Sequence, residues 1–570
     1  MRDLLIRNAR LVDGTGAAAR PADVSVEDGI VVAIDDAGSG GTAHRSIDAD
    51  GRMLTPGWVD VHTHYDAQAS WDPYLTPSSW HGVTSVVMGN CGVGFAPAAP
   101  DRHEWLIELM EGVEDIPGSA MTEGITWEWE SFEEYLDALG ARHYALDVGA
   151  QIAHGPVRGY VMGDRGAANE AATPGDITEM AAIVESGLRA GALGFSTSRT
   201  PLHRSLSGEL VPGTHAGADE LLGIADALGR VGHGVFQFAP DHVDVPTTEM
   251  PWMRELARRT GRTVSVNLNQ PNSAPDLWRD VLDQLEESRA EGLDIVAQVA
   301  GRVVGLLMCL EGSFNPLDFH PAYAPVSSLP LDERVAALQR PELRERLRIE
   351  PEDGGLFRKV VLDNLDSWWA VDDGDIDYEP EATDSIAAVA RRTGAHPIDL
   401  IVDHLCAHAG HGMILTPFFN YAYGDLSFQY EAHQHPATRM GLADAGAHCR
   451  VICDGGTPTF MLTHWTRDRR RGPTLPLELV VHRQTQQTAE LYGLGDRGVV
   501  APGKRGDLNL IDYDRLTFGP PRMAYDLPGG ARRLVQKAEG YVATFVDGVQ
   551  TVDDDELTGE LPGRLIRGPR

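Results

Sequence analysis

The sequence predicts an α/β fold in which a barrel of parallel strands and helices stands beside a smaller β unit. Between residues 56 and 494, strand-like segments alternate with helix-like segments, which is typical of parallel βα units. The two ends, residues 1–55 and 495–570, instead alternate short strand patterns with turn signals. A histidine-containing segment follows the first strand after residue 55, at the carboxyl end where α/β barrels carry their functional side chains.

Glycine-containing turns separate the expected strands at both ends of the chain. At the N-terminal end these turns are Asp13-Gly14-Thr15-Gly16 and Glu27-Asp28-Gly29, where glycine relieves the backbone. At the C-terminal end, residues 507–512 and 541–546 are strand-like, and the second strand runs into an Asp547-Gly548 turn. Each end therefore predicts a small β unit.

The middle of the chain supplies the expected βα units. Strand-like segments occupy residues 58–61, 83–88, 144–153, 191–197 and 234–238, and helix-like segments occupy residues 176–190 and 219–231. Residues 316–367 are richer in proline and charge, and residues 331–348 within them are expected to form a solvated helix. We expect this stretch to be an insertion over the barrel mouth that shapes the substrate pocket.

Composition limits the partners of the chain. At 570 residues the chain exceeds one ordinary domain, which a barrel with an insertion and a β unit explains. With 84 acidic and 48 basic residues, the net charge of −36 argues against nucleic acid or an anionic membrane as partner. Five dispersed cysteines and the lack of a visible signal peptide predict a cytoplasmic protein. The most apolar later stretch, residues 295–310, is interrupted by Gln298 and Arg302 and is too short and polar to span a bilayer.

His62 and His64 predict a metal site. Alternate side chains of a strand share a face, so both imidazoles can reach one ion at the end of the strand 58–61. Imidazole is the commonest metal ligand, and two on one rigid strand provide half of a four-coordinate site. A bare His-x-His pair also arises by chance on solvated strands, but the Pro56-Gly57 turn and the apolar strand before it favour the ligand interpretation.

Two more strand ends carry candidate residues. Cys91 follows the apolar strand 83–88, and a thiolate is a strong zinc ligand, although a buried structural cysteine is the alternative. Asp444 follows residues 439–443, again at a strand end, where a carboxylate near a cation can act as general acid and base or merely cap a turn.

Four segments together resemble the amidohydrolase superfamily and, within it, the D-aminoacylase (N-acyl-D-amino-acid deacylase) family. They are residues 56–66, 81–92, 442–448 and 498–512, and they span most of the chain. The resemblance implies a TIM-like (β/α)8 barrel, with a β-sandwich formed by the N- and C-terminal segments. It also implies that Cys91 is a metal ligand. By the same resemblance, Asp444 takes a proton from the attacking water and hands it to the leaving nitrogen.

The chain departs from this family in its expected metal ligands. The expected fourth strand, residues 191–197, has no lysine to form a carboxylated bridge between two ions. The family also supplies histidines from strands five and six, and residues 236–242 and 264–270 lack them at the corresponding places. Three explanations compete. One ion is held by His62, His64, Cys91 and Asp444, or His242 replaces a missing ligand, or the site is inactive. We favour the first, because it uses residues already placed by motifs.

Other side chains are candidates for weaker roles. His154, His242 and His448 are candidates for metal binding or for orienting a ligand, with a satisfied core histidine as the alternative for His154. The arginine that clamps the substrate carboxylate in D-aminoacylases is missing after Asp444. Arg450 could substitute for it, beside Tyr65 and Asn267. A more apolar pocket could be lined by Tyr65, Trp71, Trp80 and Tyr421.

The sequence thus predicts a metal-dependent hydrolase of an amide bond other than a peptide bond, similar to N-acyl-D-amino-acid deacylases. The expected cofactor is zinc, one ion rather than two, with manganese or iron as alternatives. The expected partner is a small-molecule amide, and a homo-oligomer stays open. Two alternatives remain: hydrolysis of a cyclic amide or imide or a deamination, and an inactive binding protein that has kept the fold.

Overall fold

Both ends of the chain contribute to one sheet. The computed structural model describes residues 2–349, 354–371 and 376–569. A nine-stranded sheet has the order β25-β24-β23-β18-β5-β1-β2-β3, and β4 pairs with β1. Its strands are β1 (Arg2–Leu11), β2 (Arg20–Glu27), β3 (Ile30–Asp35), β4 (Ala43–Asp48), β5 (Met53–Pro56), β18 (Leu508–Ile511), β23 (Tyr541–Val546), β24 (Val549–Asp553) and β25 (Glu556–Leu557). The antiparallel pair β5–β18 joins the N-terminal strands to the C-terminal ones.

Two of the turns expected from sequence are tight hairpin turns in this sheet. Glu27 pairs with Ile30, so Asp28 and Gly29 form a two-residue loop with φ of 50° and 75°. Asp547 and Gly548 do the same between β23 and β24, with φ of 52° and 76°. Positive φ at both central positions matches the right-handed twist of the flanking strands, which explains the Asp-Gly pairs.

A series of parallel strands forms the centre of the molecule. The strands are β6 (Trp58–Asp60), β7 (Val83–Met88), β8 (Asp147–Ala150), β9 (Ile152–Ala153), β10 (Gly194–Ser198), β11 (Val235–Ala239), β12 (Val264–Asn267), β13 (Ile295–Val299) and β17 (Thr438–Met440). The sheets run β6-β7-β8 and β17-β13-β12-β11-β10-β9, and only Gln151 separates β8 from β9. A parallel bridge between Thr63 and Ala445 pairs the segment after β6 with the segment after β17. The series that begins at β6 and ends at β17 therefore comes back, through this bridge, to the segment that follows β6.

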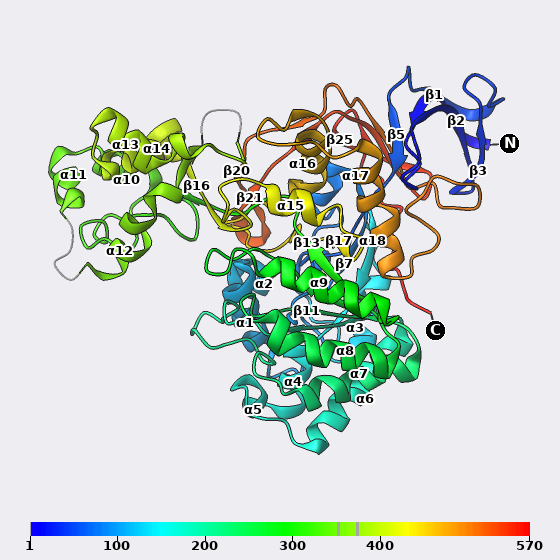
Figure 1. The fold of residues 1–570 in the computed structure, drawn as a ribbon, viewed down its shortest axis with the longest axis horizontal. Helices are drawn as coiled ribbons and strands as arrows, with labels where there is room; N and C mark the ends of the chain where they lie inside the picture. Colours follow the sequence, from blue (N-terminus) through cyan, green and yellow to red (C-terminus); the bar gives the residue numbers. More distant parts are fainter. Residues whose placement is uncertain (1, 350–353, 372–375, 570) are drawn as a thin grey trace.

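Helices follow these strands and cover them on the outside (Figure 1). They are α1 (His103–Glu114), α2 (Gly118–Gly124), α3 (Phe132–Gly140), α4 (His154–Met162), α5 (Asp164–Ala167), α6 (Pro174–Ala190), α7 (Ala218–Val231), α8 (Met250–Thr260), α9 (Leu277–Ala290), α15 (Ser427–Ala432), α16 (Thr457–Thr463), α17 (Leu477–Gln484) and α18 (Gln486–Leu491). In α6 the local signals agree: Thr173 and Asp176 form a capping box, and Gly191 ends the helix with φ of 117°.

The described residues from 304 to 419, between β13 and β17, form a separate lobe at the left of Figure 1. Its antiparallel sheet β14-β16-β15 and its helices are β14 (Val304–Cys309), β15 (Trp369–Val371), β16 (Met413–Phe419), α10 (Leu331–Leu338), α11 (Pro341–Arg348), α12 (Gly355–Val360), α13 (Ile386–Thr393) and α14 (Pro397–Gly410). The lobe buries its own apolar cluster, which includes Leu338, Leu347 and Leu405. The insertion expected at residues 316–367 lies within this larger lobe, although its residues 350–353 lie outside the described part of the chain.

The prediction of a single solvated helix at residues 331–348 was wrong in two respects. The stretch forms two helices, because Pro341 begins α11 and cannot continue α10. It is also packed: Leu338 and Leu347 are almost fully buried in the lobe's cluster. The many charged residues of this stretch suggested that it is exposed to solvent. Its apolar residues, at helical spacing, instead form a buried face.

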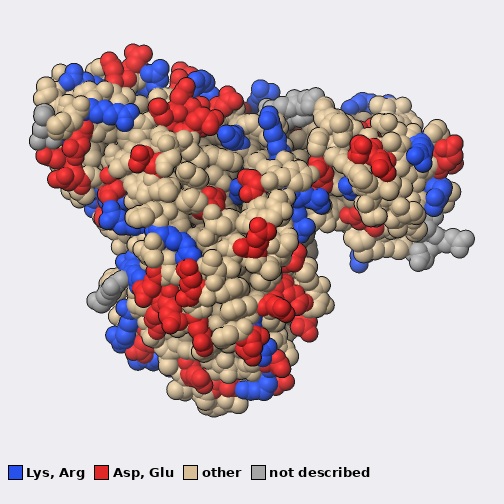
Figure 2. Space-filling view, turned by 180° about the vertical axis from the view of Figure 1, so that it is seen from behind, with Lys and Arg blue, Asp and Glu red and all other residues tan. Residues whose placement is uncertain are grey.

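Smaller elements complete the chain. They are the hairpins β19 (Thr517–Phe518) with β22 (Ala538–Glu539) and β20 (Arg522–Leu527) with β21 (Ala531–Val535), and the short helices η1 (Gln68–Ser70), η2 (Ser78–His81), η3 (Val245–Glu249), η4 (Leu362–Ser367), η5 (Ala382–Asp384), η6 (Asp454–Gly456), η7 (His464–Asp468) and η8 (Pro528–Gly530). Across residues 2–349, 354–371 and 376–569, no helix is long and apolar enough to cross a bilayer. Figure 2 shows acidic and basic side chains interspersed over the face drawn.

Candidate metal centre and active site

His62, His64 and Cys91 meet where β6 and β7 end. One ligand atom from each lies within 4.8 Å of the others, and all three side chains are buried. His62 Nε2 lies 3.3 Å from Cys91 Sγ. The Oδ1 atom of Asp444 lies 3.2 Å from His62 Nε2 and 3.5 Å from His64 Nε2. The structure thus brings together two imidazoles, a thiol and a carboxylate.

The backbone fixes these side chains against one another. The Asp444 N–H donates to the His62 carbonyl at 3.1 Å, and the His64 N–H donates to the Ala445 carbonyl at 2.8 Å. Asp444 and Cys91 have positive φ, 46° and 54°, which turns each chain sharply at the end of its strand. Gly446 next to them has φ of 93°, and a Cβ there would lie 2.8 Å from the His64 carbonyl oxygen. Glycine is therefore required at this close approach.

Partners behind the two histidines orient their rings. His62 Nδ1 lies 2.7 Å from Gln298 Oε1, which accepts a hydrogen bond when the proton is on Nδ1 and leaves the Nε2 lone pair facing Cys91 and Asp444. His64 Nδ1 lies 3.1 Å from Glu114 Oε1. A carboxylate or amide oxygen behind a histidine is the usual outer partner of a metal ligand.

The charges in the cluster favour a deprotonated thiol at Cys91 and a deprotonated carboxyl at Asp444. Burial raises the pKa of Cys91, but His62 and His64 outweigh it and lower the pKa below its ordinary value. Burial likewise opposes ionisation of Asp444, and the same two histidines hold its pKa well below the usual range. The other four cysteines, Cys309, Cys406, Cys449 and Cys453, have pKa values raised by burial to about 11 or 12. Cys91 is thus the cysteine whose surroundings suit a thiolate, and the donor set fits zinc.

The strands expected to lack histidine carry amides instead. Gln237 on β11 accepts a hydrogen bond from the Cys91 N–H at 3.0 Å and donates to Asn267 Oδ1 on β12 at 2.8 Å. Asn267 Nδ2 in turn lies 3.6 Å from Cys91 Sγ. On β10, Ser196 accepts from the Gly92 N–H at 2.9 Å. Uncharged side chains on these three strands therefore hold the Cys91 loop in place through hydrogen bonds.

A cavity of about 290 Å³ opens beside the cluster. Strands of the central series contribute one side of it, and β14 and β16 of the lobe contribute another. The lining residues are His64, Cys91, Val113, Glu114, Leu202, His203, Ala239, His242, Asn267, Asn269, Val304, Leu306, Phe418, Phe419, Leu442, Asp444, His448, Val451 and Ile452. The lobe thus shapes the cavity, but through Val304, Leu306, Phe418 and Phe419 rather than through the described residues of 316–367.

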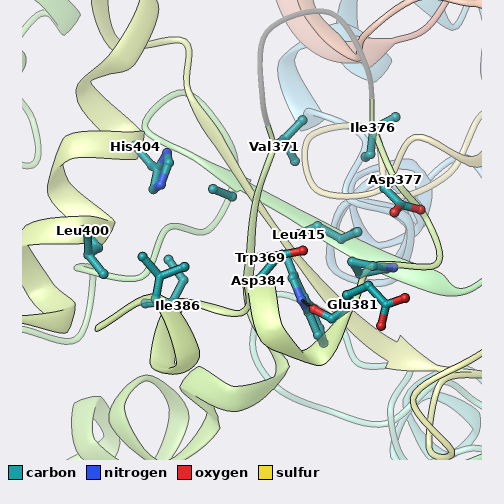
Figure 3. Close-up of a pocket in the computed structure, with 13 residues that line it drawn as sticks. Trp369, Val371, Ile376, Asp377, Glu381, Asp384, Ile386, Leu400, His404 and Leu415 are labelled. Atoms are coloured by element: carbon teal, nitrogen blue, oxygen red, sulfur yellow. Dashed lines mark hydrogen bonds between the residues drawn. The ribbon is translucent and has the colours of Figure 1, made fainter. Parts of the chain in front are cut away.

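A larger cavity of about 390 Å³ lies within the lobe, between β15, β16, α13 and α14 (Figure 3). Its acidic side chains include Asp377, Glu381 and Asp384. Within the described residues, the donor group His62, His64 and Cys91 is the one that could hold a metal ion, and it is not part of this cavity. The smaller cavity is therefore the candidate active site.

The sequence matches the amidohydrolase family over residues 45–552. The chain belongs to the amidohydrolase family. Its relatives include the N-acyl-D-aspartate deacylase of Alcaligenes xylosoxydans xylosoxydans, which is 28% identical over 99% of this chain and 95% of that protein. A crystal structure of D-aminoacylase matches with a TM-score of 0.66 at 22% identity, covering 100% of both chains.

The N-acyl-D-glutamate deacylase of Bordetella bronchiseptica, complexed with zinc and a phosphonate inhibitor that mimics the tetrahedral intermediate, has a similar fold. It matches with a TM-score of 0.65 at 23% identity, covering 100% of both chains. The predicted resemblance to D-aminoacylases is therefore confirmed, and the protein is a hydrolase of carbon–nitrogen bonds with a buried donor group that could hold a metal ion.

Several residues that the sequence suggested for this amidohydrolase lie elsewhere. His154 is not in the cavity, because its Nδ1 bonds Thr197 at 2.8 Å and its Nε2 bonds Glu220 at 2.9 Å. The Tyr65 hydroxyl is buried against Ser78 Oγ at 2.8 Å. Arg450 pairs with Asp115. None of these three lines the cavity.

Trp71, Trp80 and Tyr421 do not line the cavity either. The Tyr421 hydroxyl donates to the Pro380 carbonyl at 2.6 Å, and Trp80 lies under the Lys537 ammonium at 5.2 Å from the ring centroid. Asn267, His242 and His448 do line the cavity, outside the 4.8 Å donor group. These residues were predicted to line the pocket only because they are aromatic. In the structure their rings pack elsewhere, so that prediction was wrong.

Other residues of the site had little signal in the sequence. Gln298 was visible as a polar interruption of the apolar stretch 295–310, and the structure places it behind His62. Glu114 ends α1, a helix that carries no motif, and His203 lies in the loop after β10. Glu114 and His203 reach the site through contacts between segments that are distant in sequence, so no local sequence pattern predicts them.

Proposed function

We propose that this amidohydrolase cleaves the amide bond of an N-acyl compound by means of one zinc ion held by His62, His64, Cys91 and Asp444. The observation that carries the proposal is the convergence of these four side chains at one wall of the cavity. Two nitrogens, a thiolate and a carboxylate are ligands that zinc accepts in four-coordinate sites. Amides rather than histidines on β11 and β12 favour one ion over two.

When bound, the zinc ion would supply Lewis-acid polarisation of the amide carbonyl and would promote loss of a proton from the attacking water. Asp444 lines the cavity and is held to the His62 carbonyl by its own N–H. Its carboxylate accepts the water proton and passes it to the leaving nitrogen, as a general base and then a general acid. Glu114 and Gln298 keep the two imidazoles in position.

We also propose that the central series of strands is a (β/α)8 barrel within residues 56–494, beside a β-sandwich made of residues 1–55 and 495–570. The returning bridge Thr63–Ala445 and the likeness to D-aminoacylase support this architecture. The five cysteines are buried and free, which agrees with a reducing cytoplasm.

Substitution of Asp444 tests the proposed chemistry. The zinc-loaded protein is assayed with a panel of N-acyl compounds and cyclic amides by following release of amine, ammonia or ring-opened product. At a zinc content equal to that of the wild type, Asp444→Asn should lower kcat by roughly 10²–10⁴-fold, because the amide side chain cannot carry the proton. The control Cys449→Ala, five residues along the same segment and outside the donor group, should keep kcat within about twofold. Unchanged turnover in Asp444→Asn would refute the assigned role.

A further inference from the structure

The cavity beside the donor group has no cationic side chain of its own. No lysine or arginine appears among its lining residues, all of which lie in the described part of the chain. The nearest arginine in sequence to Asp444 on its C-terminal side, Arg450, pairs with Asp115 instead. A carboxylate on a substrate would therefore find no guanidinium to pair with in this cavity.

The cavity histidines that are not proposed metal ligands do not replace such a cation. Burial lowers the pKa of His203 to about 4 and that of His242 to about 3, so both imidazoles are neutral near pH 7. His448 Nε2 faces the Glu114 carboxylate at 3.8 Å, and that carboxylate also faces His64. Burying an unpaired carboxylate is unfavourable, which disfavours an anionic substrate here.

The remaining walls are apolar and reach the surface. Phe418 and Phe419 at the end of β16 pack edge to face with ring centroids 4.7 Å apart, and Phe419 also contacts His242 at 5.0 Å. Two lining residues are unusually exposed for large apolar side chains: Leu202 is 48% exposed and Phe418 is 43% exposed. Exposed apolar side chains at the rim of a cavity favour a ligand that covers them.

We propose that the substrate is an uncharged amide that carries an apolar group and lacks a free carboxylate. The inference rests on the proposed amide hydrolysis and specifies its substrate class. The scissile amide reaches the donor group, and the apolar group lies against Leu202 and Phe418. The acidic amino acid substrates named for two relatives do not match this cavity.

A matched pair of compounds tests the charge preference directly. N-Acetyl-D-phenylalanine and N-acetyl-2-phenylethylamine share the amide and the ring and differ in the carboxylate. The zinc-loaded protein should show a kcat/KM at least about tenfold higher for the neutral compound, which corresponds to about 1.4 kcal/mol. A preference for the carboxylate compound would overturn the inference and leave amide hydrolysis standing.

Binding separates this inference from the proposed function. Calorimetry of Asp444→Asn protein, with its zinc content first shown to equal that of the wild type, should give a lower Kd for the neutral compound. That preference without turnover by the wild type would refute the hydrolysis but support the neutral pocket. Equal affinities, or binding of neither compound, would overturn the inference.

A designed cation provides the reverse test. Leu306 lines the cavity from β14 and is partly exposed, so an arginine can be accommodated there. Leu306→Arg should shift the kcat/KM ratio toward the carboxylate compound by about tenfold. Leu356→Arg adds the same charge at a site that is 52% exposed and outside the cavity, and should leave the ratio unchanged. An equal shift in both variants would contradict the cavity assignment.

Discussion

Each donor in the cluster depends on a second residue that holds it in position. Gln298 contacts the Nδ1 atom of His62, and Glu114 contacts that of His64. Gln237 fixes the backbone of Cys91 by accepting its N–H. The site is thus preorganised by neighbours drawn from α1, β11 and β13, which are far apart in the sequence.

Glu114 offers the clearest test of this support. Glu114→Gln should weaken zinc binding by roughly 10–100-fold, because the neutral amide orients His64 less firmly and removes a negative charge behind it. Competition with a chromophoric chelator measures the affinity. Glu108→Gln removes a carboxylate from an exposed position of the same helix and should have no effect. Equal affinity in both variants would show that Glu114 does not act through His64.

At the scale of elements, a buried ion network joins the β unit to the parallel strands. Arg497 and Arg505 lie 2.6 Å and 3.0 Å from the Asp147 carboxylate on β8. Arg505 also pairs with Asp507 at 3.1 Å and with Asp547 of the hairpin at 3.2 Å. The segment 498–512, first singled out by its resemblance to a family signature, thus has a structural role in this junction.

Breaking the network should destabilise the fold. Arg497→Ala leaves the buried Asp147 with less compensation and should lower the free energy of unfolding by about 3–5 kcal/mol. Arg391→Ala removes a pair with Asp366 in which the side chains are 66% and 73% exposed, and should cost less than about 1 kcal/mol. Urea unfolding of both variants measures the difference. Similar stabilities would show that the network contributes nothing beyond an exposed pair.

Motif residues were predictable where a strand end positions them locally. His62, His64, Cys91 and Asp444 each follow the end of a short strand, and the structure brings them together. Glu114, Gln237 and the cavity wall from β14 and β16 were not predictable, because the chain supplies them through contacts distant in sequence. The extent of the lobe was also hidden, since only residues 300–303 separate β13 from β14 and no break in pattern marks the departure.

At the scale of the whole molecule, two buried histidines outside the active site make stability depend on pH. His81 bonds Thr459 Oγ1 and the Gln536 carbonyl, and burial lowers its pKa to about 4. His433 bonds the Ala300 carbonyl, and burial with Arg483 nearby lowers its pKa to about 3. Because both folded pKa values lie below the ordinary 6.5, protonation favours the unfolded chain. Their contribution to stability is complete above about pH 6.5 and is lost as the pH falls toward the folded pKa.

Removing one such histidine should flatten the dependence of stability on pH. His433→Gln should reduce the slope of unfolding free energy against pH by about 1.4 kcal/mol per pH unit between about pH 6 and pH 4.5. Denaturant unfolding at several pH values provides the slope. The exposed His44→Gln variant is the control and should keep the wild-type slope. A His433→Gln slope equal to that of wild type would contradict the buried neutral state.

The metal content of purified protein tests the central claim most directly. Protein loaded with zinc and then desalted is analysed by elemental mass spectrometry for the wild type, Cys91→Ala and the matched buried-cysteine control Cys449→Ala. The account predicts about one zinc ion per chain in the wild type and the control, and a clear loss in Cys91→Ala. Full zinc content in Cys91→Ala, or no zinc in the wild type, would contradict a metal centre at His62, His64 and Cys91.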